Sequence, residues 1–466
     1  MRSHHAVSAG LWRPPAPPIR SNLAIGWRIL FGRAPGLLHT LPRDCYTRDI
    51  VSVPIGRRPV FIVNHPETIR RICADDREFY PKSDLMISTL MPLLGEGVLI
   101  SEGERWEHDR KMLEPAFMQM RLEALFPKMR EAVDDWMRRL RALPAGTRVE
   151  LESELSRVTA DVMFRVLFSQ PIDGEQASKV FQAFDNFQRR SPQFDLRVVL
   201  DSDPVRPTSP SHELLDEATQ IRGLIESLLD ERLLRLDRGE HFIDFAQAVI
   251  DARDTNDQPF RRAQLIDQLA VFFLAGHETT ASALAWTFFL LSQQPHWLQG
   301  MRDELDHTLG DQAFAFADFR RLSVTRKILR ESLRLYPPVA FLTRRASRED
   351  RFGKLKVPTG SFIVISPWLV QRHHAYWAHA DRFDPSRFDE DASAPVTGTY
   401  LPFGLGPRAC TGAMVAQLEA TLLLCEAWRQ FDFVPVAPEA VQPVTRVSVR
   451  IEGGLPVIIR ARSPPT

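Results

Sequence analysis

The chain has 466 residues, 44% of them apolar, and its 59 basic and 59 acidic side chains cancel. Zero net charge argues against nucleic acid as a partner and gives no reason to invoke an anionic membrane surface. The four cysteines, Cys45, Cys73, Cys410 and Cys425, lack pairwise metal-ligand spacing, which indicates a reducing, cytoplasmic location rather than a disulfide framework.

The beginning of the chain is predicted to carry neither a membrane anchor nor a secretory leader. Residues 1–22 are rich in proline and are interpreted as a poorly ordered arm, followed by a single domain over 23–466. The most apolar stretch, 23–38, is interrupted by Arg28 and Arg33 and is shorter than the ~20 residues that span a bilayer. This interpretation leaves open a contact of the stretch with a membrane surface.

A short β-rich segment precedes a long helical one. The runs 50–55 and 59–63 predict a hairpin, and Pro66 opens a short helix that extends to Cys73. The mixed segment 82–99, with its proline and glycines, is interpreted as an irregular loop. Helical periodicity then covers 103–140, 151–168, 175–190, 212–238, 264–292, 296–309 and 323–335.

Two further features complete the predicted architecture. Prolines within 201–211 interrupt the helical pattern, and beyond residue 338 the chain changes to short strands and turns. The prediction is a mainly α chain with a small β portion (α+β). The late strands are expected at 345–347, 362–365, 447–451 and 457–459.

The stretch 401–412 reads Leu-Pro-Phe-Gly-Leu-Gly-Pro-Arg-Ala-Cys-Thr-Gly, and an apolar run with helical spacing follows at once. The loop delivers Cys410 onto the start of a helix, whose dipole favours the thiolate over the thiol. Its glycines let backbone amides approach the sulfur, and Arg408 adds positive charge. A plain buried cysteine at a helix start is the alternative, but it explains none of the surrounding pattern.

The pattern around Cys410 consists of Phe403, Gly404, Gly406, Arg408, Cys410 and Gly412. In every position it resembles the haem-binding signature of the cytochrome P-450 family. The resemblance implies that Cys410 is the axial thiolate ligand of haem iron and that the cofactor is haem b. It also implies a single haem domain with a long central helix over the haem, in a soluble, bacterial-type member.

The predicted helix 264–292 is roughly 43 Å long at 1.5 Å per residue and apolar nearly all round, which indicates a buried central position. Its middle reads Ala275-Gly276-His277-Glu278-Thr279-Thr280, where a glycine and a glutamate break the local rules. The hexapeptide is similar to the oxygen-activation motif of the family. By that resemblance Glu278 and Thr279 form the acid–alcohol pair that passes protons to dioxygen. A packing glycine beside a surface glutamate is the alternative.

Three charged residues are expected to support the cysteine loop. Glu331 and Arg334 lie at i and i+3, on one helix face. Taken alone, such a pair is most often a surface salt bridge. The following Pro-Pro pair and the segment 383–388 resemble the family's charge cluster, which Arg387 completes.

Several further residues are expected at the haem propionates. Trp106 and Arg110 lie at i and i+4, where an indole N–H and a guanidinium can both donate to a carboxylate. By resemblance to the family these two bind a propionate, and so does Arg345, five residues before Asp350. Arg344 is the open alternative to Arg345. The neighbouring His373, His374 and His379 are interpreted as solvated or hydrogen-bonding side chains without a metal.

The resemblance places four regions over the haem: 82–99, the helices flanking 201–211, the 272–276 turn and 339–342, with 444–446 as a weaker fifth. Their apolar character predicts a hydrophobic substrate of moderate size, bound together with dioxygen. The lining is expected to include Met86, Leu90, Phe272, Phe273, Ala275, Gly276, Ala340, Phe341 and Leu342.

No phosphate-binding glycine turn follows a strand, so no flavin is expected in this chain. Electrons are expected from a ferredoxin or flavodoxin with its NAD(P)H-dependent reductase, near the basic residues Arg105, Arg110 and Lys111. Nothing in the sequence demands more than a monomer.

The resemblance implies a monooxygenase that hydroxylates or epoxidises its substrate. Two alternatives remain: a member that uses peroxide or rearranges its substrate without reductant, and a haem-binding carrier or sensor without turnover. The presence of both Glu278 and Thr279 disfavours the first, and the second gives no reason for the pair.

Overall fold

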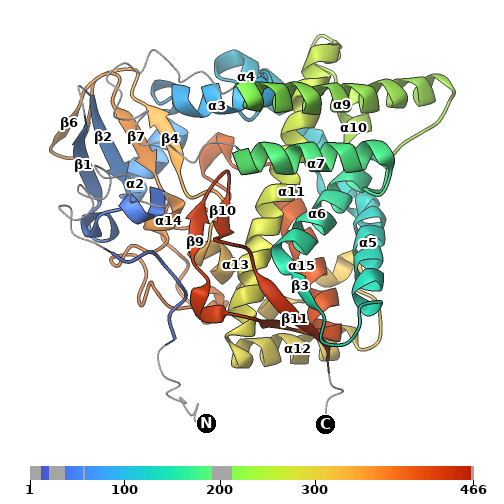
Figure 1. The fold of residues 1–466 in the computed structure, drawn as a ribbon. Helices are drawn as coiled ribbons and strands as arrows, with labels where there is room; N and C mark the ends of the chain where they lie inside the picture. The colour runs from blue at the N-terminus through green and yellow to red at the C-terminus, as the bar shows by residue number, and fades with distance from the viewer. Residues whose placement is uncertain (1–11, 20–36, 56–57, 191–211, 463–466) are drawn as a thin grey trace.

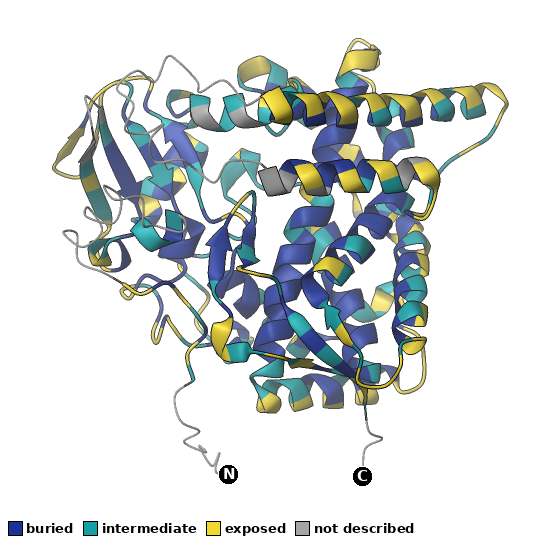
Figure 2. Ribbon diagram, in the orientation of Figure 1, coloured by how far each residue is buried: buried dark blue, intermediate teal, exposed yellow. Residues whose placement is uncertain are grey.

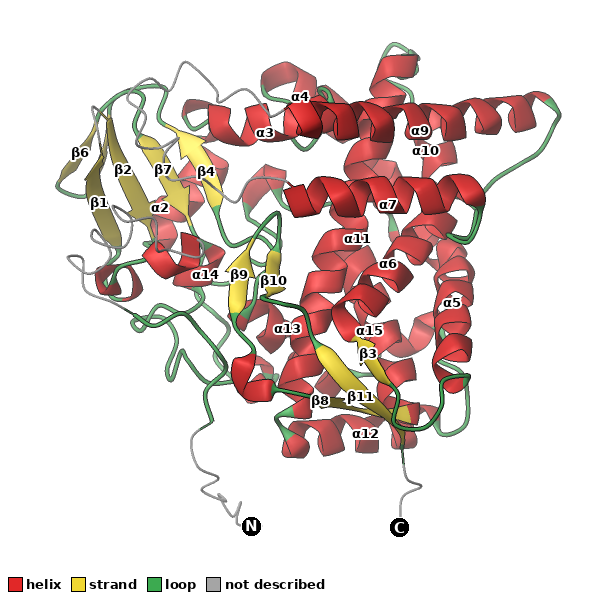
Figure 3. Ribbon diagram, viewed as in Figure 1, coloured by secondary structure: helices red, strands yellow, loops and turns green. Residues whose placement is uncertain are grey.

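The computed structural model describes residues 12–19, 37–55, 58–190 and 212–462. Most helices gather in one body, and a smaller β-rich part packs on one side of it (Figure 1). Helices dominate and strands are short, as Figure 3 shows, so the predicted mainly α architecture is confirmed. The interruption predicted at 201–211 lies outside the described residues.

The β-rich part is organised around a four-stranded sheet. Its strands are β1 (Ile50–Ile55), β2 (Arg58–Val63), β7 (Phe362–Ile365) and β4 (Leu342–Arg345), in the order β1-β2-β7-β4. The β1–β2 pair is antiparallel, which confirms the predicted hairpin, whereas β2 and β7 are parallel. The sheet therefore joins the beginning of the chain to its last third.

Seven more strands form three further sheets. They are β3 (Arg148–Glu150), β5 (Asp350–Phe352), β6 (Leu355–Val357), β8 (Phe431–Pro435), β9 (Pro443–Thr445), β10 (Val449–Ile451) and β11 (Pro456–Ala461). Of these, both β8 and β10 contact the central helix.

The helix α11 (Arg262–Ser292) runs through the middle of the helical body and confirms the predicted long central helix. It is buried along nearly its whole length (Figure 2). It packs most extensively on α6 (Leu151–Phe168). Gly276 permits this contact, because a Cβ atom there would lie 2.3 Å from Sδ of Met163. The packing interpretation of this glycine is therefore correct.

The remaining helices surround α11 and include most of those predicted. These surrounding helices are α2 (Pro66–Arg70), α3 (Asp84–Leu94), α4 (Gly103–Leu113), α5 (Gln119–Arg141), α7 (Glu175–Arg190), α9 (His212–Asp237), α10 (Phe245–Asp251), α12 (Pro295–Leu309), α13 (Ser323–Leu335), α14 (Pro367–Val370) and α15 (Ala413–Gln430). None of the helices within the described ranges combines the length and the apolar character needed to cross a membrane.

The prediction of an irregular loop over 82–99 was wrong, because α3 occupies its centre. Ser83 caps this helix by accepting a hydrogen bond from the amide of Met86, at 3.5 Å. The breaking residues lie at the helix end: Pro92 is in the last turn, and Gly95, with a φ of 54°, follows the last residue. The predicted helix over 103–140 is likewise divided, by a 3₁₀ turn at Glu114–Phe117.

Within the expected N-terminal arm, residues 12–19 pack against the helical body. The ring of Trp12 lies 6.2 Å from that of Phe289 in α11. The hydroxyl of Tyr336 donates to the carbonyl of Pro15 at 2.7 Å. The other residues of that arm lie outside the described ranges.

Candidate active site

The cysteine loop closes tightly on itself just before α15. The amide of Cys410 donates to the carbonyl of Phe403 at 2.8 Å, and Gly404 and Gly406 have φ values of 75° and 76°. A Cβ atom at Gly406 would lie 2.5 Å from the carbonyl oxygen of Cys73. Glycine is therefore required at 406 both for the backbone conformation and for the close approach.

As a whole residue Cys410 is exposed, whereas Cys45, Cys73 and Cys425 are buried. Its thiol is nevertheless enclosed enough by the loop to be desolvated. Burial raises the pKa of the Cys410 thiol, and the amide of Gly412 and the charge of Arg110 act in the opposite direction. The loop therefore places two groups beside the sulfur that favour the thiolate, against the cost of its burial. A coordinating metal ion deprotonates a thiol outright, so the site still suits a thiolate ligand.

One face of α11 is open. Between residues 265 and 291 of this helix, only Ala275, Gly276 and Thr279 are not buried, and they share one helical face. We call these three residues the open face. The hydroxyl of Thr279 donates to the carbonyl of Ala275 at 2.7 Å, so it bonds to the preceding turn of the helix.

Glu278 is only 1% exposed, which excludes the surface-glutamate interpretation. Its Oε1 accepts a hydrogen bond from the hydroxyl of Ser448 at 2.6 Å and lies 3.8 Å from Nε of Arg450 in β10. Arg450 also pairs with Glu152 at 2.7 Å. Among the described residues, Oε2 of Glu278 has no hydrogen-bond partner. Glu278 and Thr279 are adjacent in sequence but have separate hydrogen-bond partners.

Burial raises the pKa of Glu152, and Arg450 opposes this effect. Glu278 therefore belongs to a buried group of two carboxylates with one arginine. The carboxylate of Glu278 thus lies next to the open face in sequence and is shielded from bulk water.

A second group of charged residues lies beside the loop. Nζ of Lys82 and Nη1 of Arg408 both donate to the carbonyl of Ser101, at 3.0 and 3.1 Å. The Arg408 guanidinium also lies 4.2 Å from the centroid of the Trp106 ring and contacts Glu102. Lys82 is only 6% exposed. Two cations thus share one carboxylate.

The electrostatics show that this group has excess positive charge. Burial, together with the charge of Arg408, lowers the pKa of Lys82 to about 7. Burial also lowers the pKa of Arg408 to about 10. An anionic group bound here would relieve both effects, so the residues fit the carboxylates of a haem. Sequence reasoning missed Lys82 because its segment was interpreted as a loop.

The structure brings Arg344, rather than Arg345, to this group. Arg344 is 9% exposed and forms an isolated antiparallel β-bridge with Lys82. Its charge contributes to the lowered pKa of Arg408. Arg345 instead pairs with Asp84 at 3.0 Å. Successive residues of a strand point to opposite faces, so only one of the two arginines can face the loop. We call Lys82, Arg344 and Arg408 the cation cluster.

Arg110 braces the loop directly. Its Nη1 donates to the carbonyl of Ala409 at 2.9 Å, and its Nε lies 3.5 Å from Glu114. The expected neighbour Trp106 is buried under Arg408. The two residues predicted at i and i+4 therefore both contact the cysteine loop.

The predicted charge cluster is present and buried. Arg334 donates to both carboxylate oxygens of Glu331, at 2.7 and 2.8 Å, and both side chains have no exposed surface. Arg387 donates to the same carboxylate at 3.3 Å. The remaining donors of Arg334 bind backbone carbonyls, those of Gln371, Ala380 and Arg382.

Gln371 links this charge cluster to the cysteine loop. Its Nε2 donates to the carbonyls of Leu333 and Arg334, and its Oε1 accepts from the amide of Leu401, at 2.7 Å. Leu401 begins the stretch that ends at Cys410. Sequence reasoning missed Gln371, which no local pattern distinguishes.

The predicted pocket residues divide into two groups. The first group is half-buried and consists of Met86, Leu90, Phe341 and Leu342. Ala340, which precedes Phe341 in the sequence, is buried. The two phenylalanines expected in the lining have other contacts. Phe272 packs edge-on against Phe117, and Phe273 lies 4.8 Å from Phe164 and 4.6 Å from Phe184. Both are core residues of α11.

Within the described ranges, no three histidine, cysteine or carboxylate side chains form a group that could hold a metal ion. His373 is buried and its ring stacks on Tyr376 at 4.7 Å. Nδ1 of His277 donates to the carbonyl of Phe273 at 2.8 Å.

Comparisons with known proteins agree on one family. The model of the cytochrome P-450 family matches residues 15–453. Cyclooctatin synthase of Streptomyces melanosporofaciens is 28% identical, with 96% of each chain covered. Pentalenene oxygenase of Streptomyces avermitilis is 29% identical, with 99% of each chain covered. LUTEIN DEFICIENT 5 of Arabidopsis thaliana is 30% identical over 89% of this chain and 72% of the relative.

A solved structure has the same fold. The crystal structure of a mutant cytochrome P-450 haem domain superimposes with a TM-score of 0.78. It is 22% identical, and the match covers 97% of this chain and 98% of that one.

Proposed function

Because this chain belongs to the cytochrome P-450 family of haem-thiolate monooxygenases, we propose that it inserts one atom of dioxygen into an apolar small molecule, by hydroxylation or epoxidation. The single observation that carries this proposal is the open face of α11. A helix that is otherwise buried exposes Ala275, Gly276 and the hydroxyl of Thr279, beside a buried carboxylate.

The residues present suit haem b. Cys410 would ligate the iron, and the cation cluster with Trp106 would hold the propionates. The bound haem supplies the binding of dioxygen and its reductive cleavage. The chain itself supplies a tight loop around the sulfur, in which Arg110 and Gly412 stabilise its negative charge.

Glu278 and Thr279 serve proton delivery in this proposal. Thr279 presents its hydroxyl on the open face, and Glu278 lies behind it, fixed by Ser448 and Arg450. Oε2 of Glu278, without a partner among the described residues, is the atom that exchanges a proton with water. Thr279 then breaks its hydrogen bond to the carbonyl of Ala275, donates its own hydroxyl proton onward, and accepts in return the proton that Glu278 releases.

The substrate is proposed to be apolar and of moderate size. The half-buried Met86, Leu90, Phe341 and Leu342 offer few hydrogen-bonding groups. The test is an optical titration of the haem-loaded protein with fatty acids, terpenes, steroids and small aromatics. A saturable Soret shift with one class identifies the substrate chemistry. Shifts with charged, polar compounds alone would overturn the proposal.

Electrons are proposed to come from a ferredoxin or flavodoxin with its NAD(P)H-dependent reductase. Lys111 in α4 is exposed, on the same helix whose Arg110 contacts the cysteine loop. Reduction by an acidic ferredoxin should slow as ionic strength rises. An unchanged rate would contradict this part of the proposal.

The four cysteines are all unpaired, which supports a reducing, cytoplasmic location. A monomer is proposed as the working unit. A haem carrier or sensor without turnover is disfavoured, because such a protein has no use for the buried Glu278 with its hydrogen bond from Ser448. Steady consumption of reductant with formation of an oxygenated product distinguishes the two.

A further inference from the structure

Arg372, two residues after α14, is a buried arginine that has no counter-charge among the described residues. Its side chain is 6% exposed, and within the described ranges its Nη1 has no hydrogen-bond partner and no carboxylate lies at ion-pair distance. A buried charge is costly unless it is paired and hydrogen-bonded. Burial also lowers the pKa of Arg372 to about 10, as expected for a guanidinium removed from water.

The guanidinium is held in place by aromatic rings. Its central carbon lies 3.5 Å from the centroid of the Trp368 ring and 5.4 Å from that of Tyr336. Contact with a ring covers the face of a guanidinium and leaves the N–H groups at its edge available. The Trp368 indole in turn donates to the hydroxyl of Tyr46 at 3.2 Å. The arginine is therefore positioned before any ligand arrives.

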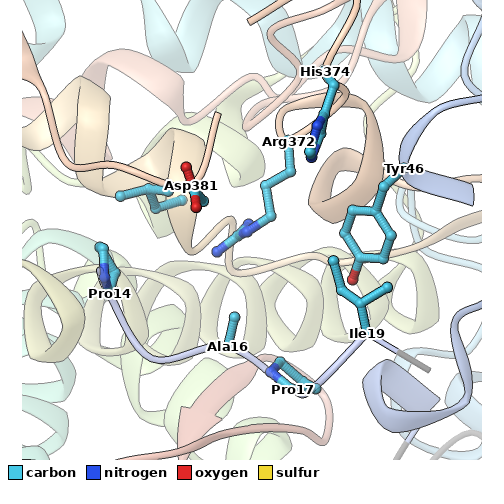
Figure 4. A pocket seen from close by; sticks show the side chains of 9 residues that line it. Pro14, Ala16, Pro17, Ile19, Tyr46, Arg372, His374 and Asp381 are labelled. Atoms are coloured by element: carbon cyan, nitrogen blue, oxygen red, sulfur yellow. The ribbon is translucent and has the colours of Figure 1, made fainter. Parts of the chain in front are cut away.

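Arg372 points into a recess between the 14–19 segment and the helical body (Figure 4). The recess has a cavity volume of about 70 Å³ and opens to solvent on one side. Its walls are mainly apolar, and none belongs to the cysteine loop or the open face. They consist of Pro14, Ala16, Pro17, Ile19, Tyr46, Leu335, Arg372, His374 and Asp381.

The acidic group at the rim is already engaged. Asp381 pairs with Arg13 at 3.0 Å, and both side chains are largely exposed. Figure 4 shows Asp381 and Ala16 on opposite sides of the guanidinium. The unmatched charge inside the recess is therefore positive.

We propose that this recess binds a small carboxylate with an apolar body. The edge of the Arg372 guanidinium matches a carboxylate in a bidentate geometry. The proline, leucine and isoleucine walls cover the apolar part. A phosphate dianion fits less well, because it needs more donors than one arginine supplies. The site is independent of the monooxygenase reaction proposed above.

The first test is a crystal of the haem-loaded protein soaked with 4-bromobenzoate, with imidazole as iron ligand to block the haem pocket. The proposal expects anomalous bromine density in the recess and the carboxylate on Arg372. Bromine density elsewhere only, or none, would overturn it. A parallel soak with inorganic phosphate that places phosphate on Arg372, while 4-bromobenzoate stays out, would overturn the assignment to a carboxylate.

The second test uses calorimetric titration of 4-bromobenzoate into the imidazole-blocked protein. Arg372→Gln should abolish the binding. Arg372→Gln also removes a buried contact to Trp368, so this variant could fail to fold. The matched pair Ala16→Glu and Ala16→Gln tests the site without changing Arg372. Ala16 is exposed, and its side chain points toward the guanidinium in Figure 4.

A glutamate at 16 supplies a tethered carboxylate at an effective concentration of the order of mM, so it should weaken binding about tenfold or more. It should also raise the melting temperature by giving Arg372 a partner. Ala16→Gln has the same length without the charge and should do neither. Equal affinities for 4-bromobenzoate in both variants and the unmodified protein would overturn the proposal.

Discussion

Two buried cationic regions differ in how fully the protein satisfies them. Every donor nitrogen of Arg334 binds a protein oxygen, from Glu331 or from three backbone carbonyls. Lys82 and Arg408 instead share Ser101 and the single carboxylate of Glu102. The difference separates charges that protein groups fully satisfy from charges that the proposed function assigns to the haem carboxylates.

The largest expected effect is at the satisfied cluster. Glu331→Gln removes one partner of a fully buried ion pair and should reduce the free energy of unfolding by about 3–5 kcal/mol. Urea denaturation of the haem-loaded protein measures this loss.

The matched control is Arg321→Gln, which removes the exposed arginine of a pair with Asp318 at the same i,i+3 spacing. It should cost about 1 kcal/mol or less. Similar losses in both variants would remove the structural role of Glu331.

The next effect concerns the cation cluster. Arg408→Gln and Lys82→Met should each speed the loss of haem to an acceptor protein about ten- to hundredfold, since a hydrogen bond to a charged group contributes about 1.5–3 kcal/mol. Stability of the haem-free protein should stay the same or rise. Arg348→Gln, at an exposed pair with Asp76, is the control. A strong loss of haem-free stability would instead make the cluster structural.

Thr279 and Thr280 allow the same comparison within one helix. Each hydroxyl donates to the carbonyl four residues earlier, at 2.7 and 2.9 Å, but only Thr279 lies on the open face. Thr279→Ala should uncouple turnover several-fold: reductant is consumed, peroxide leaks and product falls. Thr280→Ala should retain coupling. Peroxide and product measured per reductant decide this, and equal coupling in both variants would remove Thr279 from proton delivery.

The smallest expected effect is a pH dependence in the haem-free protein. The pKa of Lys82 is about 7 when folded and 10.5 in its ordinary state. Between these values the unfolded chain binds more protons, so the free energy of unfolding should rise with pH from 7 to 10. Lys82→Met should flatten this rise. Urea titrations across the range measure it, and an identical slope in the variant contradicts the burial of a lysine there.

Much of the site could be predicted because it depends on local spacing. The Cys410 loop, the Glu278–Thr279 pair and the i,i+3 pair of Glu331 and Arg334 each lie within one short stretch. The fold class and the long helix α11 follow from apolar periodicity for the same reason.

The remaining features depend on contacts between distant segments. Lys82 is buried because it contacts Ser101 and lies beside Arg408, both distant in sequence. The helix α3, which begins two residues after Lys82, was not predicted because of a proline and glycines that lie at the helix end. The choice between Arg344 and Arg345 depends on which face of β4 meets the loop. The Arg372 recess requires the 12–19 segment, which composition alone assigned to a loose arm.

The central claim is that Cys410 ligates haem iron through its thiolate. The most direct measurement is the absorption spectrum of the reduced, carbon monoxide-bound protein, compared between the unmodified chain, Cys410→Ser and the buried control Cys45→Ser. We predict the thiolate-type Soret band in the unmodified chain and in Cys45→Ser, and its loss in Cys410→Ser. A thiolate-type band that persists in Cys410→Ser would contradict the claim.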